Sequence, residues 1–314
     1  MTIAWIFNLD AERELAAHRA GVAARAPGAA ARRRMAEAIE HLGRPVKEGG
    51  VLGPGDVVVD GVQESQGALP RGATPRAWCP TPRARAAMAR VGLELPGPSV
   101  EALIAANSRE TFAALDPLPG ALVVTSQGAL RAAVERAGLP RSGGGGHGRA
   151  AWVLRRSLCS AGSGRLIAEA WGEPAERWSR AALAEGPVEV QPLVDIVDEY
   201  SVHGFVDEGG GVRCGEPLRW RGPAHEDEPG DEPGEQLRVV PPLSEAGYVR
   251  LVRSGAQVGE ALVDLGYSGP FGVDAFRWRG ADGAVSLQVA TDINARLTFQ
   301  FARGAPELLG ALSS

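Results

Sequence analysis

The sequence predicts a mixed α/β and α+β fold. Three observations support this prediction: a strand at 2–8 that leads straight into a helix, short apolar runs that alternate with helical stretches up to residue 137, and strands that dominate from 187 to 216. The chain has 314 residues, of which 44% are hydrophobic and 23% are charged. This composition can bury the core of one large globular unit or of two to three closely packed domains.

The first third of the chain has the pattern of alternating strands and helices. ThrIleAlaTrpIlePheAsn at 2–8 is typical of a buried strand, and the helix after it begins around Asp10 with acidic residues in its first turn. ValValValAsp at 57–60 is a short apolar run between glycines, as in a buried strand, and 77–82 is typical of another strand end. Further helices are predicted at 29–43, 84–92, 99–106 and 108–115. AspProLeuProGly at 116–120 is a natural domain boundary.

The middle of the chain continues with a strand at 121–125 and a helix at 127–137. SerGlyGlyGlyGlyHisGly at 142–148 is too rich in glycine to hold one shape, so a mobile loop is predicted there. AlaAlaTrpValLeuArgArg at 150–156 is typical of a strand. SerAlaGlySerGlyArg at 160–165 predicts a flexible turn that leads into an amphipathic helix.

The last third is predicted to be rich in strands around one long helix. The acidic segment 221–236, rich in proline and glycine, is predicted to be an exposed loop. A helix at 244–265 precedes two strands, at 270–278 and 284–291, and the turn between them carries an AspGly pair. The two strands are therefore expected to form a hairpin.

Charge and cysteine content exclude several classes of protein. A formal net charge of −5 argues against a surface built for nucleic acid, and no apolar run reaches the roughly 18 residues of a membrane span. Acidic residues stand near the start, where a signal peptide would be basic, so a cytoplasmic protein is expected. Three widely spaced cysteines indicate neither a disulfide framework nor a zinc site. Lys47 is the only lysine, so any bound phosphate must be held by arginine or by backbone N–H groups.

Two C-terminal segments carry the clearest chemical pattern: GlyProPheGlyValAspAlaPhe at 269–276 and ValAlaThrAspIleAsnAlaArgLeuThr at 289–298. Side chains alternate along a strand, so Asp292 and Asn294 point to one face, and a hairpin can bring Asp274 beside them. Two carboxylates and an amide oxygen make a site suited to a hard cation such as Mg²⁺. The alternative is that Asp274 and Asp292 are strand-edge residues or caps.

These two segments resemble the signature of the ATP-grasp superfamily, with an acid in the first strand and an acid-x-Asn-x-Arg element in the second. The resemblance implies that Asp274, Asp292 and Asn294 bind Mg²⁺ and that Arg296 lies near the transferred phosphate or the substrate carboxylate. The family position matching Asp292 is usually glutamate. Because aspartate is one methylene shorter, the site is expected to bind a single ion, to shift its geometry or to have weakened chemistry.

The resemblance extends to a nucleotide site. ValLeuArgArgSerLeuCysSerAlaGlySerGly at 153–164 is similar to the basic strand and small-residue phosphate loop of this superfamily, with Arg155 where lysine is usual. Ser160, Gly162 and Gly164 would supply flexible backbone N–H donors, although a plain loop is the alternative. Arg155 keeps the charge of the lysine but changes its geometry.

Three further segments complete the implied ATP site. The stretch 190–202 resembles the hinge between the two ATP-grasp subdomains, where the Gln191 carbonyl and the Leu193 amide would read the adenine edge. Glu199 stands in the place of the acid that binds the ribose hydroxyls; the alternative is a surface acid on an edge strand. Arg109 resembles a basic position leading from the first domain and would contact phosphate.

The resemblance implies an ATP-grasp fold preceded by a Rossmann-like pre-ATP-grasp domain. The expected domains are a pre-ATP-grasp domain at 1–115, a first subdomain with the phosphate loop at 116–190 and a second with the magnesium site at 191–314. The implied activity is an ATP-dependent carboxylate–amine ligase that forms an acyl phosphate and releases ADP and phosphate. Arg296 and Arg155 would be its catalytic residues.

Three rival hypotheses stay open. The departures at Asp292 and Arg155 could mark a catalytically impaired protein that binds nucleotide as a regulatory or partner subunit. The fold could instead phosphorylate a substrate without ligation. A Rossmann-type oxidoreductase is the third, but 8–14 lacks the glycines of a dinucleotide turn. Expected partners are small-molecule or peptide carboxylates and amines, with no nucleic acid and no membrane. The oligomeric state is open, with a homodimer common in families of this fold.

Overall fold

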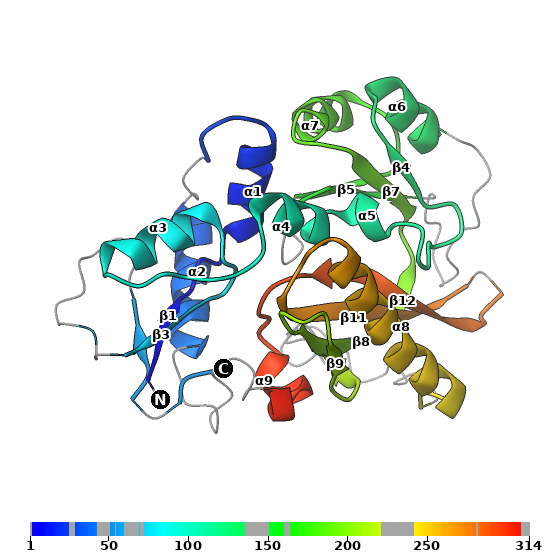
Figure 1. Ribbon diagram of the computed structural model, residues 1–314. Helices are drawn as coiled ribbons and strands as arrows, with labels where there is room; N and C mark the ends of the chain where they lie inside the picture. The colour runs from blue at the N-terminus through cyan, green and yellow to red at the C-terminus, as the bar shows by residue number, and fades with distance from the viewer. Residues whose placement is uncertain are drawn as a thin grey trace, which may run out of the picture.

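Three β-sheets, each built from its own stretch of the chain, carry the fold (Figure 1). The protein is described by a computed structural model that covers residues 2–24, 29–42, 51–53, 55–59, 69, 72–135, 151–159, 164–220, 242–280 and 282–308. Helices pack on all three sheets, so the expected α/β and α+β fold class is confirmed. No helix within these ranges combines the length and the apolar character needed to cross a bilayer.

The first sheet is parallel, with the order β2-β1-β3, as expected for strands joined through helices. Its central strand is completely buried, and its first N–H donates to Oδ1 of Asp56 at 2.8 Å. The elements of this part are β1 (Ile3–Ile6), α1 (Ala11–Arg19), α2 (Ala29–Leu42), β2 (Val57–Val58), β3 (Thr74–Ala77) and α3 (Pro82–Arg90). Thr81 caps α3 by accepting a hydrogen bond from the Ala84 N–H, and Pro82 occupies its first turn.

The second sheet is antiparallel, with the order β4-β7-β5-β6, and α6 and α7 cover it. Its elements are β4 (Leu122–Val124), α6 (Gln127–Glu135), β5 (Trp152–Arg156), β6 (Arg165–Ala168), α7 (Glu173–Leu183) and β7 (Val188–Pro192). The prediction of a helix directly after the 160–165 turn is wrong, because β6 comes first and pairs with β5. The helix begins only at Glu173. Gly172 is its extended N-cap residue, and Pro174 lies in its first turn.

The third sheet holds the strands that carry the predicted metal site. Its order is β10-β8-β11-β12, and β9 also pairs with β8, all in antiparallel fashion. Its elements are β8 (Asp195–Val206), β9 (Val212–Cys214), β10 (Leu218–Trp220), α8 (Glu245–Asp264), β11 (Gly269–Arg279) and β12 (Val285–Asn294). Leu251 of α8 packs with Val202 and Ala275 on one face of the sheet. The opposite face carries Ser201 and Asp274, so the alternation of the strands separates an apolar from a polar face.

Three short helices of the described chain lie outside the sheets. The first two, α4 (Val100–Asn107) and α5 (Arg109–Phe112), lead from the first sheet to the second, and α9 (Phe301–Gly304) follows the last strand. The α5 helix contacts both β7 and β12, which places it between the second and third sheets (Figure 1). Asn107 fixes the end of α4 by hydrogen bonds to both the N–H and the carbonyl of Ala295, at 3.0 and 3.3 Å. The end of α4 is therefore tied to the segment that directly follows β12.

The predicted boundary at 116–120 begins with a residue that is attached to the third sheet. The carboxylate of Asp116 accepts two hydrogen bonds from Arg250, both at 2.8 Å, and one from the Val289 N–H at 2.8 Å. The sheets fall into separate sequence ranges, and the divisions at 115 and 190 stay predictions. The glycine loop at 142–148 and the acidic segment at 221–236 lie outside the described residues.

Arg19 at the end of α1 joins this helix to α5 and to segments next to the second sheet. Its guanidinium donates to Ser108, Glu110 and Ser157 at 2.8 to 3.2 Å, and to the Glu185 carbonyl at 2.6 and 2.8 Å. Gly186 makes room for it: φ is +152°, and an added Cβ would overlap the Arg19 guanidinium. Backbone conformation and close approach therefore both require glycine at this position.

We expect Gly186→Ala to lower the free energy of unfolding by about 2 kcal/mol or more, because the side chain would strain the backbone and displace the guanidinium. The matched control is Gly128→Ala in α6, where a Cβ would meet nothing within 4 Å. That change should raise stability by roughly 0.5–1 kcal/mol, as for any exposed helical glycine. Urea denaturation of both variants checks the prediction, and equal effects would contradict the role given to Arg19.

His203 on β8 is buried, with an exposed fraction of 2%. Its ring nitrogens lie 3.0 Å from the Ser201 and Thr298 hydroxyls, and Phe301 packs against its edge. No carboxylate among the described residues pairs with the ring, and burial lowers the pKa of His203 to about 4. The folded protein therefore holds this imidazole neutral at pH values where the unfolded chain protonates it.

The pH dependence of stability follows from this difference. Between about pH 6.5 and 4 the unfolded chain binds one more proton than the folded protein at His203, so the free energy of unfolding should fall by about 1.4 kcal/mol per pH unit as the pH falls. Above pH 6.5 the residue should contribute no slope. His203→Asn should remove this component of the slope, as measured by denaturant titrations between pH 4 and 7. An unchanged slope in the variant would assign the acid sensitivity to other groups.

Candidate functional site

The polar face of the third sheet brings the predicted metal-binding residues together. Asp274 on β11 stands directly opposite Asp292 on β12, and Asn294 stands opposite Gly272. The Asn294 amide nitrogen donates to Oδ2 of Asp274 at 3.1 Å. The two segments are thus neighbouring strands, as the sequence indicates, and the three side chains share one face. Their role as metal ligands stays a prediction.

A bulge in β12 shapes this cluster. Asp274 pairs with Asp292 and Phe276 pairs with Gln288, so two steps along β11 correspond to four along β12. Ala290, inside the bulge, has a φ of +53°, a conformation that costs energy for a residue with a Cβ. The Thr291 hydroxyl closes the bulge by donating to the Asp274 carbonyl at 3.0 Å. Backbone strain of this kind is concentrated at functional sites in proteins.

Electrostatics make the pair of carboxylates receptive to a cation. Burial and the nearby charge of Asp292 raise the pKa of Asp274 to about 7, while Arg296 and the hydrogen bond from Asn294 act in the opposite direction. A bound cation would relieve the repulsion between the two carboxylates, and carboxylate and amide oxygens are the ligands that Mg²⁺ prefers. In the described part of the chain no group of three or more His, Cys, Asp or Glu side chains could hold a metal ion. The candidate set is instead two carboxylates with one amide.

The Asn294 amide is turned so that its nitrogen faces Asp274. Its oxygen accepts a hydrogen bond from Nη2 of Arg296 at 2.7 Å. Asn294 can therefore offer its oxygen to a cation beside Asp274 only if the amide rotates. The donor set fits Mg²⁺ with Asp274 and Asp292 as primary ligands.

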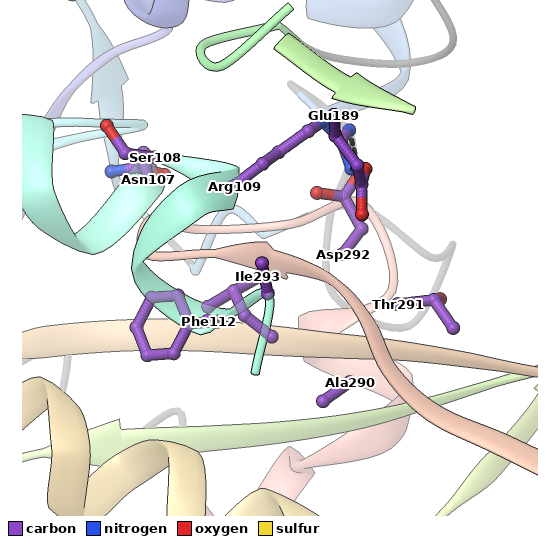
Figure 2. Close-up of a pocket in the computed structure, with 10 residues that line it drawn as sticks. Asn107, Ser108, Arg109, Phe112, Glu189, Ala290, Thr291, Asp292 and Ile293 are labelled. Carbon is purple, nitrogen blue, oxygen red and sulfur yellow. Dashed lines mark hydrogen bonds and ion pairs between the residues drawn. The ribbon is translucent and has the colours of Figure 1, made fainter. Parts of the chain in front are cut away.

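Arg109 reaches across to this cluster from the start of α5 (Figure 2). Its Nη2 donates to Oδ2 of Asp292 at 2.8 Å, and its Nη1 lies 3.9 Å from Oε2 of Glu189 on β7. The side chain is 9% exposed, yet its Nε and Nη1 have no hydrogen-bond partner within the described structure. These buried donors and the buried Glu189 oxygen border a cavity of about 20 Å³, about the space of one water molecule. These buried N–H groups need a partner, which one water molecule in this cavity, or an anion that displaces Asp292 and Glu189 from Arg109, would provide.

Arg155 stands next to Arg109 at the end of β5. It lies directly opposite Glu189 on β7, and its guanidinium forms no hydrogen bond or ion pair with any described residue. Burial and the charge of Arg109 lower the pKa of Arg155. The Arg109 N–H donates to the Ser157 carbonyl at 3.1 Å, which fixes the spacing of the two arginines. The protein thus holds two close guanidinium groups that an anion would stabilise.

The predicted phosphate loop is described only in part. Gly164 has a φ of +71°, and an added Cβ would lie 2.9 Å from Cβ of Cys159, so a glycine is required there. Its carbonyl accepts a hydrogen bond from the Arg156 N–H at 3.1 Å. Ser160 and Gly162 lie outside the described residues. Burial raises the pKa of Cys159, which argues against a nucleophilic thiolate in this loop.

The predicted hinge residues lie along β7 and β8. Gln191 is buried opposite Val153, and the Leu193 N–H donates to the Ala151 carbonyl at 2.9 Å, so a nucleotide would compete for that donor. Glu199 stands opposite Phe276, and its charge contributes to the raised pKa of Asp274. The carboxylate therefore lies on the polar face of the third sheet. The adenine and ribose roles of these residues stay predictions.

Arg296 is buried between α1 and the third sheet. It forms an ion pair with Glu12 of α1, donates to the Leu297 carbonyl at 3.1 Å, and lies with its guanidinium carbon 5.1 Å from the centre of the Trp78 ring. Together with the bond to Asn294, it connects α1 to the carboxylate cluster. Nearby, the Thr81 hydroxyl and the Arg83 backbone N–H both donate to the carboxylate of Glu14 on α1.

Sequence reasoning missed Glu189, Glu12 and Trp78. The signal for Glu189 is the alternation ValGluValGln, which places it on the same face of β7 as Gln191. Glu12 appears only as one of several acids in the first turn of α1, and nothing in the sequence indicates that it pairs with a residue 284 positions away. Long-range pairs of this kind require the fold.

Comparison with known proteins gives similarity only among solved structures. No family model matches the chain, and no curated protein matches it. The structure of N5-carboxyaminoimidazole ribonucleotide synthetase from Thermus thermophilus aligns with a TM-score of 0.45 at 18% identity, over 94% of this chain and 72% of that one. D-alanyl-alanine synthetase A from Vibrio cholerae aligns with a TM-score of 0.48 at 13% identity, over 94% and 88%.

A third structure, N5-carboxyaminoimidazole synthase from Aspergillus clavatus with ADP and 5-aminoimidazole ribonucleotide, aligns with a TM-score of 0.41 at 12% identity, over 95% of this chain and 70% of that one. Each TM-score lies below 0.5. We therefore infer the function of this chain from the contacts of its own residues.

Proposed function

We propose that this chain is an ATP-grasp protein that uses ATP to activate a carboxylate as an acyl phosphate and joins it to an amine, releasing ADP and phosphate. One observation carries the proposal: two cross-strand carboxylates, Asp274 and Asp292, lie beside two partly buried arginines, of which Arg109 keeps two N–H groups without a hydrogen bond and Arg155 has no side-chain partner among the described residues. Two acids beside two guanidinium groups with donors to spare match the charge pattern of a magnesium–phosphate complex.

The roles of the residues follow from their positions. Arg109 and Arg155, which lie on the second-sheet side of the cluster, would bind phosphate oxygens of ATP. Asp274 and Asp292, with Asn294 after rotation of its amide, would hold Mg²⁺. The ion, when bound, would offset negative charge on the phosphates. Phosphoryl transfer of this kind depends on positioning and charge rather than on a protein nucleophile, which agrees with the absence of an activated thiol among the described cysteines.

In the present arrangement the Arg109 guanidinium forms ion pairs with Asp292 and Glu189. Phosphate groups would take over these contacts, and Asp292 would then be available to the cation. Arg296, on the opposite side of Asn294, would face the acid that is to be phosphorylated. The nucleotide and the acid would therefore approach the carboxylate pair from opposite sides.

The reaction can be tested by trapping. Purified protein is incubated with Mg²⁺, ATP, hydroxylamine and panels of carboxylic acids, and ADP and hydroxamate are measured together. An acyl phosphate reacts with hydroxylamine to a hydroxamate, so a ligase should give equal amounts of the two products with an active acid. Asp292→Asn should reduce both at least about 100-fold, the scale of removing one strong transition-state interaction. Arg131→Met, at an exposed ion pair on α6, is the control and should leave both unchanged.

The rival hypotheses predict different products. Phosphorylation without ligation would give ADP and a stable phosphorylated product, without hydroxamate. A nucleotide-binding regulatory subunit would bind ATP and give neither product with any acid. Hydroxamate without ADP would contradict the ATP-dependent mechanism altogether.

A further inference from the structure

A second cavity, of about 380 Å³, lies between the first sheet and the third sheet. It is separate from the small cavity at Arg109, and its size is within the range of small-molecule sites. One wall comes from β1, β3 and the segment 95–97, and the other from β8, β9 and the segment 267–270. Arg296 and Leu297 close the end nearest to the carboxylate cluster.

The walls of this cavity are largely apolar and aromatic. Trp5, Trp78, Leu95 and Phe205 contribute to them. Trp5, Trp78 and Leu95 are buried, and Trp5 stacks on a neighbouring phenylalanine at 5.8 Å, so this surface is held in place by the core. Trp5 and Trp78 expose only 1% and 2% of their surface, so they give the cavity a rigid apolar backing, and the more exposed Phe205 offers the aromatic contact area. The cavity is therefore suited to an apolar body.

The 95–97 wall is built into the fold rather than left as a free loop. Arg85 of α3 donates to the Pro80 carbonyl at 2.9 Å and to the Pro98 carbonyl at 2.6 Å. Gly97 packs so closely that an added Cβ would lie 2.9 Å from Cγ of Pro80, and its φ is +140°. The wall is thus preorganised, which lowers the cost of binding a ligand against it.

The charged groups around the cavity favour an anion. Three arginines line it, Arg76, Arg213 and Arg296, against two acids, Asp207 and Glu208. Asp207 already accepts the Gly211 N–H at 2.7 Å within its own turn. Arg213 lies over the Phe205 ring at 5.7 Å, and no described carboxylate lies within ion-pair distance of it. The charge of Arg296 is compensated by its ion pair with Glu12, so Arg213 supplies the remaining positive charge beside the apolar walls, which suits an organic acid with an apolar body.

Arg296 connects this cavity to the proposed reaction site. Three of its five N–H groups bind Glu12, Asn294 and the Leu297 carbonyl in the described structure, and a guanidinium has two more to offer. Asn294 in turn binds Asp274. A carboxylate held at Arg296 would therefore lie next to the pair of acids that we propose for Mg²⁺.

We propose that this cavity binds an organic acid with an aromatic or branched apolar body, with its carboxylate toward Arg296 and its body between Trp5, Trp78 and Phe205. The acid would be the carboxylate substrate of the ligase, a step that rests on the proposed function. Binding of the acid itself needs no nucleotide, so the two proposals can fail separately.

The test is calorimetric titration of the full chain, without ATP or Mg²⁺, with three probes: 3-phenylpropionate, 3-phenylpropan-1-ol and propionate. The first carries both the body and the charge, and each of the others lacks one of them. We expect 3-phenylpropionate to bind at least tenfold more tightly than either. Equal affinity of the alcohol would overturn the carboxylate assignment, equal affinity of propionate would overturn the apolar one, and no binding of any probe at millimolar concentration would overturn the site.

Variants locate the binding. Ala77→Leu fills the cavity and should abolish binding of 3-phenylpropionate, whereas Ala89→Leu, the same change at an exposed position of α3, should not. Wild-type affinity in Ala77→Leu would place the ligand elsewhere. If circular dichroism shows that this variant does not fold, the exposed Arg213→Gln decides: it should weaken binding of the acid by about threefold or more and leave the alcohol unaffected, and an unchanged affinity for the acid would overturn the proposal.

The double variant Asp274→Asn, Asp292→Asn separates this proposal from the proposed function. It should retain 3-phenylpropionate binding while it loses the effect of Mg²⁺ on ATP binding. If the wild-type chain binds 3-phenylpropionate but not ATP, the acid site is supported and only its role as a substrate site is removed. Loss of acid binding in the double variant would contradict the separate location of the two sites.

Discussion

Replacing Arg296 with methionine is expected to lower the free energy of unfolding by about 3–5 kcal/mol, the usual cost of breaking a buried ion pair by removing one partner. The change would leave Glu12 buried, with an exposed fraction of 5% and no other cation within ion-pair distance among the described residues. Oε2 of Glu12 already lacks a hydrogen-bond partner, so without Arg296 few contacts would stabilise the negative charge of this carboxylate. The cation–π contact with Trp78 would be lost as well.

Urea denaturation of Arg296→Met measures this loss, and a second variant shows its cause. Glu12→Gln combined with Arg296→Met removes both charges, and it should recover at least half of the lost stability. A loss of less than about 1 kcal/mol in the single variant would mean that the pair is solvated, in the manner of surface ion pairs. In that case the contact of Arg296 with Glu12 would not hold α1 against the carboxylate cluster.

Arg155→Met is expected to change stability and nucleotide affinity in opposite directions. The Arg155 guanidinium has no hydrogen-bond or ion-pair partner among the described residues, and burial disfavours its charge. Without ligand, the variant should be as stable as the wild type or more stable by about 1 kcal/mol, because a poorly compensated charge is removed. Its affinity for ATP with Mg²⁺ should fall by about 100-fold, the scale of a lost charge-assisted contact to phosphate.

Thermal denaturation and calorimetry on one preparation of Arg155→Met check both parts. Arg131→Met is the matched control, because Arg131 pairs with Glu135 on the exposed face of α6 at 2.9 Å. The control should change neither quantity by more than the small contribution of a surface pair. If Arg155→Met lost stability and kept its ATP affinity, the residue would be a structural partner of Glu189 rather than a phosphate ligand.

The elements of the fold follow from local patterns that the sequence displays. The β11–β12 hairpin is an example: alternating residues and an AspGly turn predict both strands, and the structure pairs Asp274 with Asp292 across them. The error at 165–168 has a physical reason as well. Four residues are too few to distinguish one turn of an amphipathic helix from a strand, and pairing with β5 decides for the strand.

Residue spacing alone predicted the candidate site only where its residues lie on neighbouring strands, whereas Arg109 and Arg155 were named through the family resemblance. Asp274, Asp292 and Asn294 meet through a short hairpin, so their spacing alone indicates their proximity. Glu189 and Arg109 reach the same place from β7 and α5, and Glu12 pairs with Arg296 across nearly the whole chain. Such contacts depend on how the three sheets pack, which no local pattern encodes.

Calorimetric titration of ATP, with and without Mg²⁺, into the wild type and the Asp274→Asn, Asp292→Asn double variant tests the central claim most directly. We predict that the wild type binds ATP in a magnesium-dependent manner and that the double variant, folded by circular dichroism, loses the effect of Mg²⁺. Failure of the wild type to bind ATP, or equal binding by the two proteins, would contradict the assignment of the carboxylate pair and with it the ligase.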